Sequence, residues 1–524
     1  MNTRRDFSRK TTWADVFNAV FVPFQAAFLF ILCFLFAVSD LRGQQQERLD
    51  LSVAQKIKQE EMKNSDVERL SYLLMDLAGP RLAGSEGMER GYQVAEEIMR
   101  SYHLSNPRIE FGSEWLRGGW DVHKVYACMT VPYYIPIPAA PVGWTDGTDG
   151  IVKGKAELVT ATTFEELNRL KGTFKGKIVL VPSTLKYVIN FAPLATRHTE
   201  ESLKQIVDYP LRMSAQPPLA SAVKTLTNRD IVDFLREEEA AVILNANGEF
   251  GVPGITFYRL EQTGKHVPCE LNIPLENHGQ MVRLIMNGEE VQMEIEVRVT
   301  FEKNKTINNV IAEIPGVDPK LKDQLVIIGA HLDCYPFSPG AGDDAAGCIT
   351  MLEAMRILKA IDIKPRRTIR ICLWGGEELG LYGSSGYVRQ FVMDMDKDEK
   401  KKEYDKISAY FNSDYGPGKF RGIYTQDNIQ VNHVFREWLQ PFTDMGVATV
   451  SNKSVGSTDH IPFDRAGIPA FQFIQDNMEW GRHSHKMQDF PDRIVLDDLR
   501  SNAVIMAWFA YCAAMRDEML PRKQ

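Results

Sequence analysis

Short apolar runs alternate with longer amphipathic segments in the C-terminal part of the chain, from Asn308 onward. "QLVIIGAH", "RTIRICLWG", "KISAYFNSD" and "IPAFQFIQD" have the continuous apolar character of buried strands. The segment "AGCITMLEAMRILKAI" has its apolar residues at helical spacing. This alternation predicts an α/β fold, with a mostly parallel, mixed sheet flanked by helices on both faces. In such sheets ligands bind at the carboxyl ends of the strands.

The earlier parts of the chain have different patterns. Residues 49–103 carry apolar positions at helical spacing and are expected to be mainly helical. From about Gly150 to Phe301 short strand-like runs with glycine and proline turns take over, which indicates an inserted β-rich module. We therefore expect four parts, namely an export segment at 1–39, the first part of the main domain at 40–149, the insert at 150–303 and the main part at 304–524.

The N-terminus resembles a secretory signal with a long basic front. Four basic residues among the first ten precede a largely apolar run at residues 18–40, and small residues at 37–39 offer a cleavage site. The alternative is a retained membrane anchor, because the run approaches the roughly 20 residues that span a bilayer. Pro23 and Gln25 interrupt it and favour cleavage. Either way we expect an exported protein, periplasmic or extracellular, which contacts the membrane only if this segment is retained.

Composition excludes few classes of protein. The 524 residues are 44% hydrophobic and 25% charged, as in ordinary globular proteins, and the length allows two or three domains. The formal net charge of −8 gives no basic surface of the kind that nucleic-acid binding needs, so we expect no nucleic-acid partner. Besides Cys33 in the export segment, six cysteines are irregularly spaced, and one or two disulfides are allowed but not required.

Polar residues of the metal-ligating types gather where the predicted strands end. They are His331 and Asp333, Asp343 and Asp344, Glu377 and Glu378, Asp414, and finally His483, His485 and Asp489. Successive strand ends meet at one edge of a parallel sheet, so these residues are expected to converge on a single crevice. Taken singly, each has an ordinary explanation as a helix cap, a turn residue or a structural histidine. Their joint occurrence in one region points to a functional site.

A cluster of negative charge of this size is hard to keep without a cation. Imidazole and carboxylate ligands without cysteine suit zinc, with manganese or cobalt as alternatives. Two ions a few ångströms apart would need a bridging carboxylate, and Asp343 in a glycine-rich loop suits that position.

These motifs resemble, in order and spacing, a family of two-zinc exopeptidases. "HLD", "GAGDDAAG", "WGGEELGLYGSSGYV", "NSD" and "SHKMQDFPD" are similar to the motifs of secreted bacterial aminopeptidases, plasma glutamate carboxypeptidase and glutamate carboxypeptidase II. The likeness covers about residues 49–149 and 304–515. "FKGKIVLVPS" and "AAVILNANG" resemble the protease-associated domain, which some members carry as an insert at this place.

The resemblance implies two Zn²⁺ per chain and a role for each motif residue. His331 and Asp414 would bind the first zinc, Glu378 and His485 the second, and Asp343 both. Asp333 would orient the imidazole of His331 from behind. Glu377 would stay unligated and act as the general base on a metal-bridging water. The adjacent glutamates would therefore divide into one base and one ligand.

Two positions depart from the family pattern or leave a choice. The family's histidine is followed by serine or threonine, whereas His485 is followed by Lys486 and His483 by Ser484. We prefer His485, because its spacing to the aspartate at 489 then fits. In "STDHIPF", which resembles the pocket-lining segment, Asp459 and His460 would either contact substrate or hold a loop.

The expected function is that of an exported zinc exopeptidase that removes N-terminal residues from peptides or splits dipeptides. The alternatives are carboxypeptidase-like cleavage, with Arg482 or Lys486 gripping the terminal carboxylate, and a non-catalytic peptide-binding ectodomain. A related single-zinc cyclase acting on N-terminal glutamine is a further alternative, which the long insert disfavours. A peptide or dipeptide is the expected partner, and a homodimer is left open.

Overall fold

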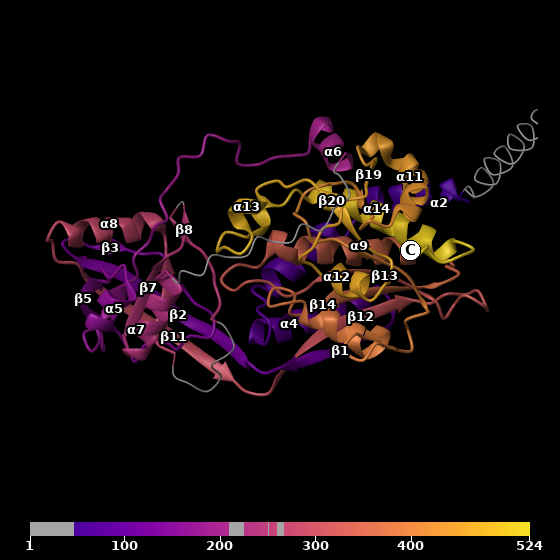
Figure 1. Ribbon diagram of the computed structural model, residues 1–524. Helices are drawn as coiled ribbons and strands as arrows, with labels where there is room; N and C mark the ends of the chain where they lie inside the picture. The colour runs from indigo at the N-terminus through magenta and orange to yellow at the C-terminus, as the bar shows by residue number, and fades with distance from the viewer. Residues whose placement is uncertain (1–46, 209–224, 250, 259–266, 524) are drawn as a thin grey trace, which may run out of the picture. The chain divides into compact units, whose positions relative to one another are not determined.

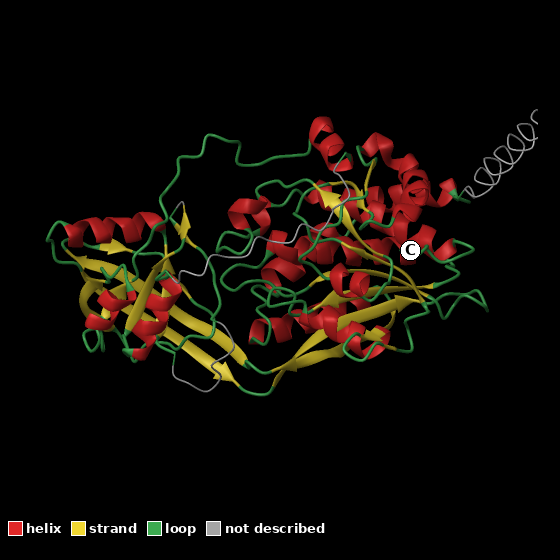
Figure 2. Ribbon diagram, viewed as in Figure 1, coloured by secondary structure: helices red, strands yellow, loops and turns green. Residues whose placement is uncertain are grey.

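The strands of the computed structural model form two eight-stranded sheets (Figures 1 and 2). The structure describes residues 47–208, 225–249, 251–258 and 267–523. No helix within these ranges is both long and apolar enough to cross a membrane. The predicted leader at 1–39 lies outside the described residues, so its cleavage stays a prediction.

The first sheet has a parallel centre. Its strands are β1 (Ser105–Trp115), β12 (Lys305–Ile314), β13 (Leu325–His331), β14 (Thr368–Trp374), β17 (Ile407–Asn412), β18 (Phe420–Tyr424), β19 (Thr449–Ser451) and β20 (Ala470–Gln475). They follow the order β1-β12-β14-β13-β17-β20-β18-β19. Neighbours β14, β13, β17 and β20 run parallel, while β12 pairs antiparallel with β14, and β18 antiparallel with β20. The carboxyl ends of the four central strands therefore lie at one edge.

Helices cover both faces of this sheet, because its central strands are apolar on both sides. The covering helices are α9 (Ala346–Ala360), α14 (Leu496–Met515), α10 (Tyr382–Tyr387) and α12 (His460–Arg465). Val326 and Ile328 of β13 belong to a core cluster that includes α9 and α14. Ile327, between them, belongs to a second cluster that includes Tyr387 of α10 and Phe463 of α12. The predicted α/β class, with a mixed sheet between helices, is confirmed.

The second sheet lies mainly in the segment predicted to be β-rich. Its strands are β2 (Gly119–Val131), β3 (Ile135–Pro136), β4 (Ala140–Pro141), β5 (Val152–Leu158), β6 (Ile178–Leu180), β7 (Val242–Ala246), β10 (Cys269–Ile273) and β11 (Gln292–Glu302). They follow the order β3-β2-β11-β5-β6-β7-β10-β4 and enclose a core of their own. Since β2, β3 and β4 precede residue 150, this sheet begins earlier than the expected insert. The boundary at 150 and the protease-associated assignment stay predictions.

The remaining elements are mostly helices on the surface of the two sheets. Residues 49–103 are mainly helical, as predicted, and Ser85 caps α4 by accepting the Met88 N–H at 3.1 Å. Those helices are α2 (Leu51–Asn64), α3 (Val67–Ser71), η1 (Tyr72–Leu77) and α4 (Glu86–Ser101). Others are α5 (Phe164–Arg169), α6 (Glu200–Val207), α7 (Asn228–Glu237), α8 (Leu275–Met286), α11 (Asn432–Leu439), α13 (Trp480–His483), η3 (Ala341–Ala345), η4 (Val388–Val392), η5 (Ile429–Val431), η6 (Gln440–Met445) and η7 (Pro491–Arg493). Two short strand pairs join β8 (Gly248–Glu249) to β9 (Val252–Pro253) and β15 (Met393–Asp394) to β16 (Glu399–Lys400).

The six cysteines among the described residues are all buried free thiols. No disulfide therefore contributes to this part of the fold, and its stability rests on the apolar cores of the two sheets.

Candidate metal centre

Three neighbouring parallel strands bring the predicted site residues to one edge of the first sheet. His331 is the last residue of β13, Glu377 follows shortly after the end of β14, and Asp414 lies just beyond β17. Because β14, β13 and β17 are adjacent and parallel, their ends share this edge. The sheet itself thus accounts for the convergence predicted from the sequence.

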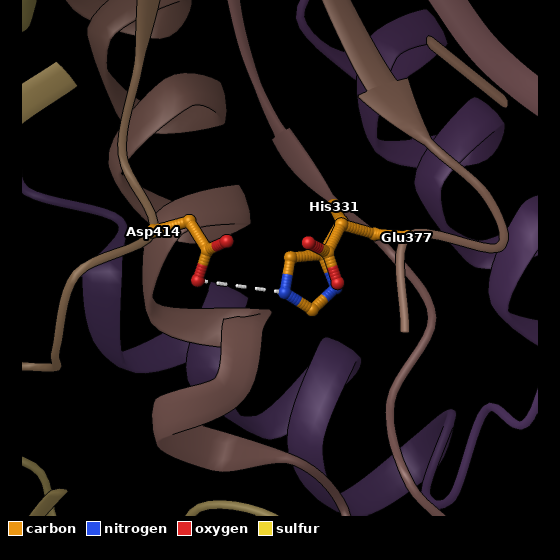
Figure 3. Close-up of side chains that lie close together, drawn as sticks. All are labelled: His331, Glu377 and Asp414. Carbon is orange, nitrogen blue, oxygen red and sulfur yellow. Dashed lines mark ion pairs between the residues drawn. The ribbon is translucent and has the colours of Figure 1, made fainter. Parts of the chain in front are cut away.

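The first group of possible metal ligands consists of His331, Glu377 and Asp414. Each offers a ligand atom, and these atoms lie within 4.8 Å of one another. The carboxylate of Asp414 faces the imidazole of His331, with its Oδ1 3.6 Å from Nε2, and Glu377 lies beside the ring (Figure 3). His331 and Asp414 are buried, whereas Glu377 is part-exposed.

A second group of possible ligands shares His331 with the first. His331, Asp343 and Glu378 also bring one ligand atom each within 4.8 Å. Asp343 Oδ1 is 3.2 Å from His331 Nε2, and Asp343 Oδ2 is 3.3 Å from His485 Nε2. His485 Nε2 lies 2.9 Å from Glu378 Oε2. The two oxygens of one carboxylate therefore face two different histidines.

Asp333 explains how two glutamates can be held side by side. Its carboxylate accepts the backbone N–H groups of Glu377 at 3.0 Å and of Glu378 at 3.3 Å. Its backbone carbonyl lies 2.9 Å from His331 Nδ1 and its Oδ1 3.6 Å from the same nitrogen. A proton on Nδ1 leaves Nε2 free to face the cluster. The backbone carbonyl of Asp333 therefore contacts the imidazole, and its carboxylate, expected to orient that ring, instead holds the turn that carries both glutamates.

Asp489 holds the loop of Asp343 from the opposite side. Its carboxylate accepts the backbone N–H groups of Gly342 at 2.7 Å and Asp343 at 3.0 Å. His483 Nδ1 lies 2.9 Å from Asp489 Oδ1, so His483 pairs with this supporting residue, whereas His485 reaches Asp343 and Glu378. This geometry supports the preference for His485. The sequence marks Asp489 only by its spacing and gives no sign of its two hydrogen bonds.

The neighbouring aspartates 343 and 344 have different surroundings. Asp344 Oδ1 accepts the N–H of Gly347 at 2.9 Å, in the first turn of α9. Of the two, only Asp343 belongs to a group of possible ligands among the described residues, the one with His331 and Glu378. Asp344 thus bonds the first turn of the following helix, while Asp343 faces the cluster.

The electrostatics of the cluster call for a cation. Burial raises the pKa of Glu377 well above its usual value, raises the pKa of Glu378 to about 8, and raises the pKa of Asp414. Burial alone would lower the pKa of His485, but hydrogen bonds to Asp343 and Glu378 raise it to about 10. Burial first, and neighbouring carboxylates second, make ionised carboxylates unfavourable here, and a cation would relieve that cost.

The residues present fit divalent cations. Glu378 Oε1 is buried and has no hydrogen-bond partner among the described residues. An unpaired buried carboxylate oxygen is costly unless a cation or donor meets it. The donors are imidazole nitrogens and carboxylate oxygens, the set that suits zinc. His331, Asp343, Glu378, Asp414 and His485 could hold such ions.

A cavity of about 520 Å³ opens over the cluster. It is lined by Asp343, Glu377, Glu378, Gly380, Leu381, Asp414, Tyr415, Ser457, Asn477, Trp480, Ser484 and His485. The lining combines the charge of four carboxylates with the apolar surface of a tryptophan. The sequence does not single out Asn477 or Trp480, because no motif marks them, whereas Ser457 begins the segment "STDHIPF" and Tyr415 directly follows Asp414.

Asp459 and His460 are not among the residues that line this cavity. Both are fully buried. Asp459 accepts a hydrogen bond from the Ser384 hydroxyl, and His460 Nε2 lies 2.8 Å from Gln426 Nε2 and 3.1 Å from the carbonyl of Val455. Of the two roles expected for these residues, the contacts favour holding a loop over touching substrate.

Comparison with known proteins gives a family for this arrangement. Residues 309–510, which include every residue of the cluster, match the model of peptidase family M28. This match confirms the predicted resemblance to a peptidase family over the main part of the α/β domain. A peptidase acts on peptides, so peptides are among its partners.

Relatives extend the likeness beyond the matched residues. Carboxypeptidase Q of Pongo abelii is 25% identical over 465 residues, which are 88% of this chain and 87% of the relative. Aminopeptidase YwaD of Bacillus subtilis is 33% identical over 190 residues, which are 36% of this chain and 39% of the relative. A peptidase M28 precursor from Shewanella amazonensis has the same fold, with a TM-score of 0.65, 22% identity, and coverage of 90% of this chain and 98% of that one.

Proposed function

We propose that the protein is an exported two-zinc exopeptidase that hydrolyses the N-terminal peptide bond of peptides or dipeptides. The observation that carries this proposal is the position of Asp343, whose two carboxylate oxygens face His331 and His485. His331 and Asp414 would hold the first ion, and Glu378 and His485 the second. Asp343 would bridge them.

Zinc bound here would polarise the scissile carbonyl and lower the pKa of water. The chain itself would position the groups that move protons. Glu377 lines the cavity, and Asp333 fixes its backbone N–H. Burial raises its pKa well above the usual value, which suits a group that takes a proton from water and returns it to the leaving amine. Such general-base catalysis is typically worth about 10²–10⁴-fold in rate.

The charge of the cavity favours a substrate with a free amine. Asp343, Glu377, Glu378 and Asp414 all line it, and the structure places no basic side chain other than His485 among the described lining residues. With two zinc ions bound, their charge would offset the ligands Asp343, Glu378 and Asp414, and the unligated Glu377 would be left to attract an ammonium group. A negative charge at that position supports cleavage next to the N-terminus.

Carboxypeptidase-like cleavage is the second candidate, because the relatives that match most of this chain include carboxypeptidase Q. The two basic residues considered for gripping a terminal carboxylate already have partners in their own loop. Arg482 Nη1 donates to Glu479 Oε1 at 2.7 Å, and Lys486 Nζ donates to the carbonyl of Gly481 at 2.8 Å. These contacts favour a structural role for both side chains.

Hydrolysis of a peptide panel distinguishes the two candidates. Dipeptides and tripeptides would be offered with free and with acetylated amines to the zinc-loaded protein, with the Glu377→Gln variant as the blank. Cleavage of the free-amine set alone is the expected result. Cleavage of the acetylated set would instead establish a carboxypeptidase, and no cleavage of either set by zinc-loaded protein would favour the peptide-binding alternative.

The proposal also covers export, the oligomeric state and the nature of the insert. We infer export from the leader-like sequence at 1–39, and a membrane contact only if that segment is retained. A homodimer stays open, and gel filtration with light scattering measures it directly. The protease-associated character of the insert is proposed on sequence likeness alone.

A further inference from the structure

His485 is supported differently from the other proposed ligands. It lies on the loop after α13, its backbone has a left-handed φ of +57°, and its side chain is 49% exposed. His331, by contrast, ends a central strand and is fully buried. A non-glycine residue in this conformation persists only where its surroundings hold it. Something other than the sheet must therefore position His485.

One face of the His485 ring is covered by Tyr335. The two rings are stacked, with centroids 3.9 Å apart and planes 11° from parallel. Stacking restricts rotation of the imidazole while its Nε2 remains 2.9 Å from Glu378 Oε2 and 3.3 Å from Asp343 Oδ2. Tyr335 acts through the ring of a proposed ligand, so its place is that of a positioning residue.

Tyr335 is in turn held by Phe257, which precedes β10 of the second sheet. Phe257 meets its ring edge-on at a centroid distance of 4.6 Å, and Trp144 meets Phe257 at 5.6 Å. Trp144 packs against Trp115 and Trp120 in a buried cluster. A continuous row of rings thus runs from this cluster to the imidazole of His485.

The backbone of the same segment also reaches the histidine loop. The N–H of Ile255 donates to the carbonyl of His485 at 3.4 Å, and Gly254 forms an antiparallel bridge with Lys486. On its other side the segment is bonded to Gly143, whose N–H donates to Thr256 at 2.9 Å and whose carbonyl accepts from Tyr258 at 3.0 Å. Residues 254–258 are therefore held between Gly143 and the loop of His485.

We propose that residues 254–257 and Tyr335 position His485, so that the β-rich part of the chain controls the second metal site. The inference rests on the proposed two-zinc function. In this proposal the segment is more than a passive spacer. Its backbone holds the histidine loop, and Phe257 and Tyr335 fix the plane of the imidazole. Loss of a residue that orients a metal ligand typically weakens metal binding about 10–100-fold.

Zinc titration of the metal-free full-length protein tests this directly. Calorimetry in the presence of a competing chelator gives the stoichiometry and the affinity of each site, and His485→Ala defines the protein with the second site removed. We expect Tyr335→Leu and Phe257→Leu to weaken the second site about 10–100-fold and to leave the first unchanged. Tyr335→Phe keeps the stacked ring and is expected to bind zinc as the wild type does.

The control variant is Phe174→Leu, which removes another buried aromatic from the β-rich part, where Phe174 packs on Phe234. It is expected to leave both zinc affinities unchanged. Wild-type affinity in both Tyr335→Leu and Phe257→Leu would overturn the inference, as would an equal loss in Phe174→Leu. If the wild-type protein binds fewer than two ions, the proposed function itself is overturned and this inference falls with it.

Discussion

The two halves of the candidate metal centre are built in different ways. His331, Asp414 and Glu377 lie at or just beyond the ends of three adjacent parallel strands, and the sheet fixes their relative positions. Glu378 and His485 contact each other in the cavity lining. The position of His485 depends on its own loop, on Tyr335 and on a segment from the β-rich part of the chain. The first half is a product of fold topology, whereas the second is assembled by tertiary contacts.

This difference predicts unequal tolerance to change. A ligand at a strand end is surrounded by core residues, so its replacement disturbs the fold as well as the metal. A half-exposed loop ligand can be lost at a smaller cost in stability. The second site is consequently the one that sequence changes elsewhere in the chain can weaken or strengthen.

The largest effect is expected where the two halves join. Asp343→Ala removes the carboxylate that faces both histidines, so we expect loss of zinc and a fall in peptide hydrolysis on the order of 10³-fold or more. Metal analysis and a hydrolysis assay measure this. Asp344→Asn, which keeps the oxygen that accepts the Gly347 N–H, is the control and is expected to keep both ions. Two tightly bound zincs in Asp343→Ala would refute the bridge.

Replacing each histidine separately tests the contrast in stability. His331→Ala leaves buried carboxylates without their partner, and we expect it to lower the free energy of unfolding of the metal-free protein by about 3 kcal/mol. His485→Ala is expected to lower it by less, about 2 kcal/mol, because its hydrogen bonds to Asp343 and Glu378 are made from a half-exposed position. Urea unfolding of both variants gives these values. Equal losses would show that the two halves are equally integrated in the fold.

Asp489 supports the junction from behind, so its replacement is expected to have an intermediate effect. Asp489→Asn replaces one of the two oxygens that accept the Gly342 and Asp343 N–H groups by a donor. We expect zinc affinity to fall about 10–100-fold. The exposed Asp492→Asn is the matched control, and zinc competition assays compare the two. Unchanged zinc affinity in Asp489→Asn would show that this residue does not support the metal centre.

The last prediction is a pH dependence that belongs to the second half. In the metal-free protein the pKa of His485 is raised from 6.5 to about 10 and that of Glu378 from 4.5 to about 8. The folded protein therefore binds protons that the unfolded chain has released. The His485 contribution is full below pH 6.5 and is lost as the pH rises through 10, and that of Glu378 is lost as the pH rises through 8.

Thermal unfolding of the metal-free protein across this range should show stability falling as the pH rises from 6.5 to 10. His485→Gln is expected to flatten the upper part of the curve. Bound zinc should flatten it as well, because a ligand imidazole carries no proton on its ligating nitrogen. A stability that rises with pH in this window would contradict the assigned charges.

The sequence predicts the first half of the centre well, because the period of the hydrophobic residues and the ends of the strands are local features of the chain. The run "LVIIGAH" indicates both a buried strand and the histidine that ends it. The choice between His483 and His485 depends on which side chain faces Asp343, and only the structure places His483 against Asp489 instead. The residues that hold His485 carry no motif, because Tyr335 and Phe257 are ordinary aromatic residues until the fold brings them together.

The most direct test of the central claim is a comparison of the wild-type protein with Glu377→Gln. Zinc content and hydrolysis of free-amine dipeptides would be measured on the same preparations. The account predicts two zinc ions in both proteins, and a turnover number about 10²–10⁴-fold lower in the variant. Full activity in Glu377→Gln, or a wild-type protein with fewer than two ions and undiminished activity, would contradict it.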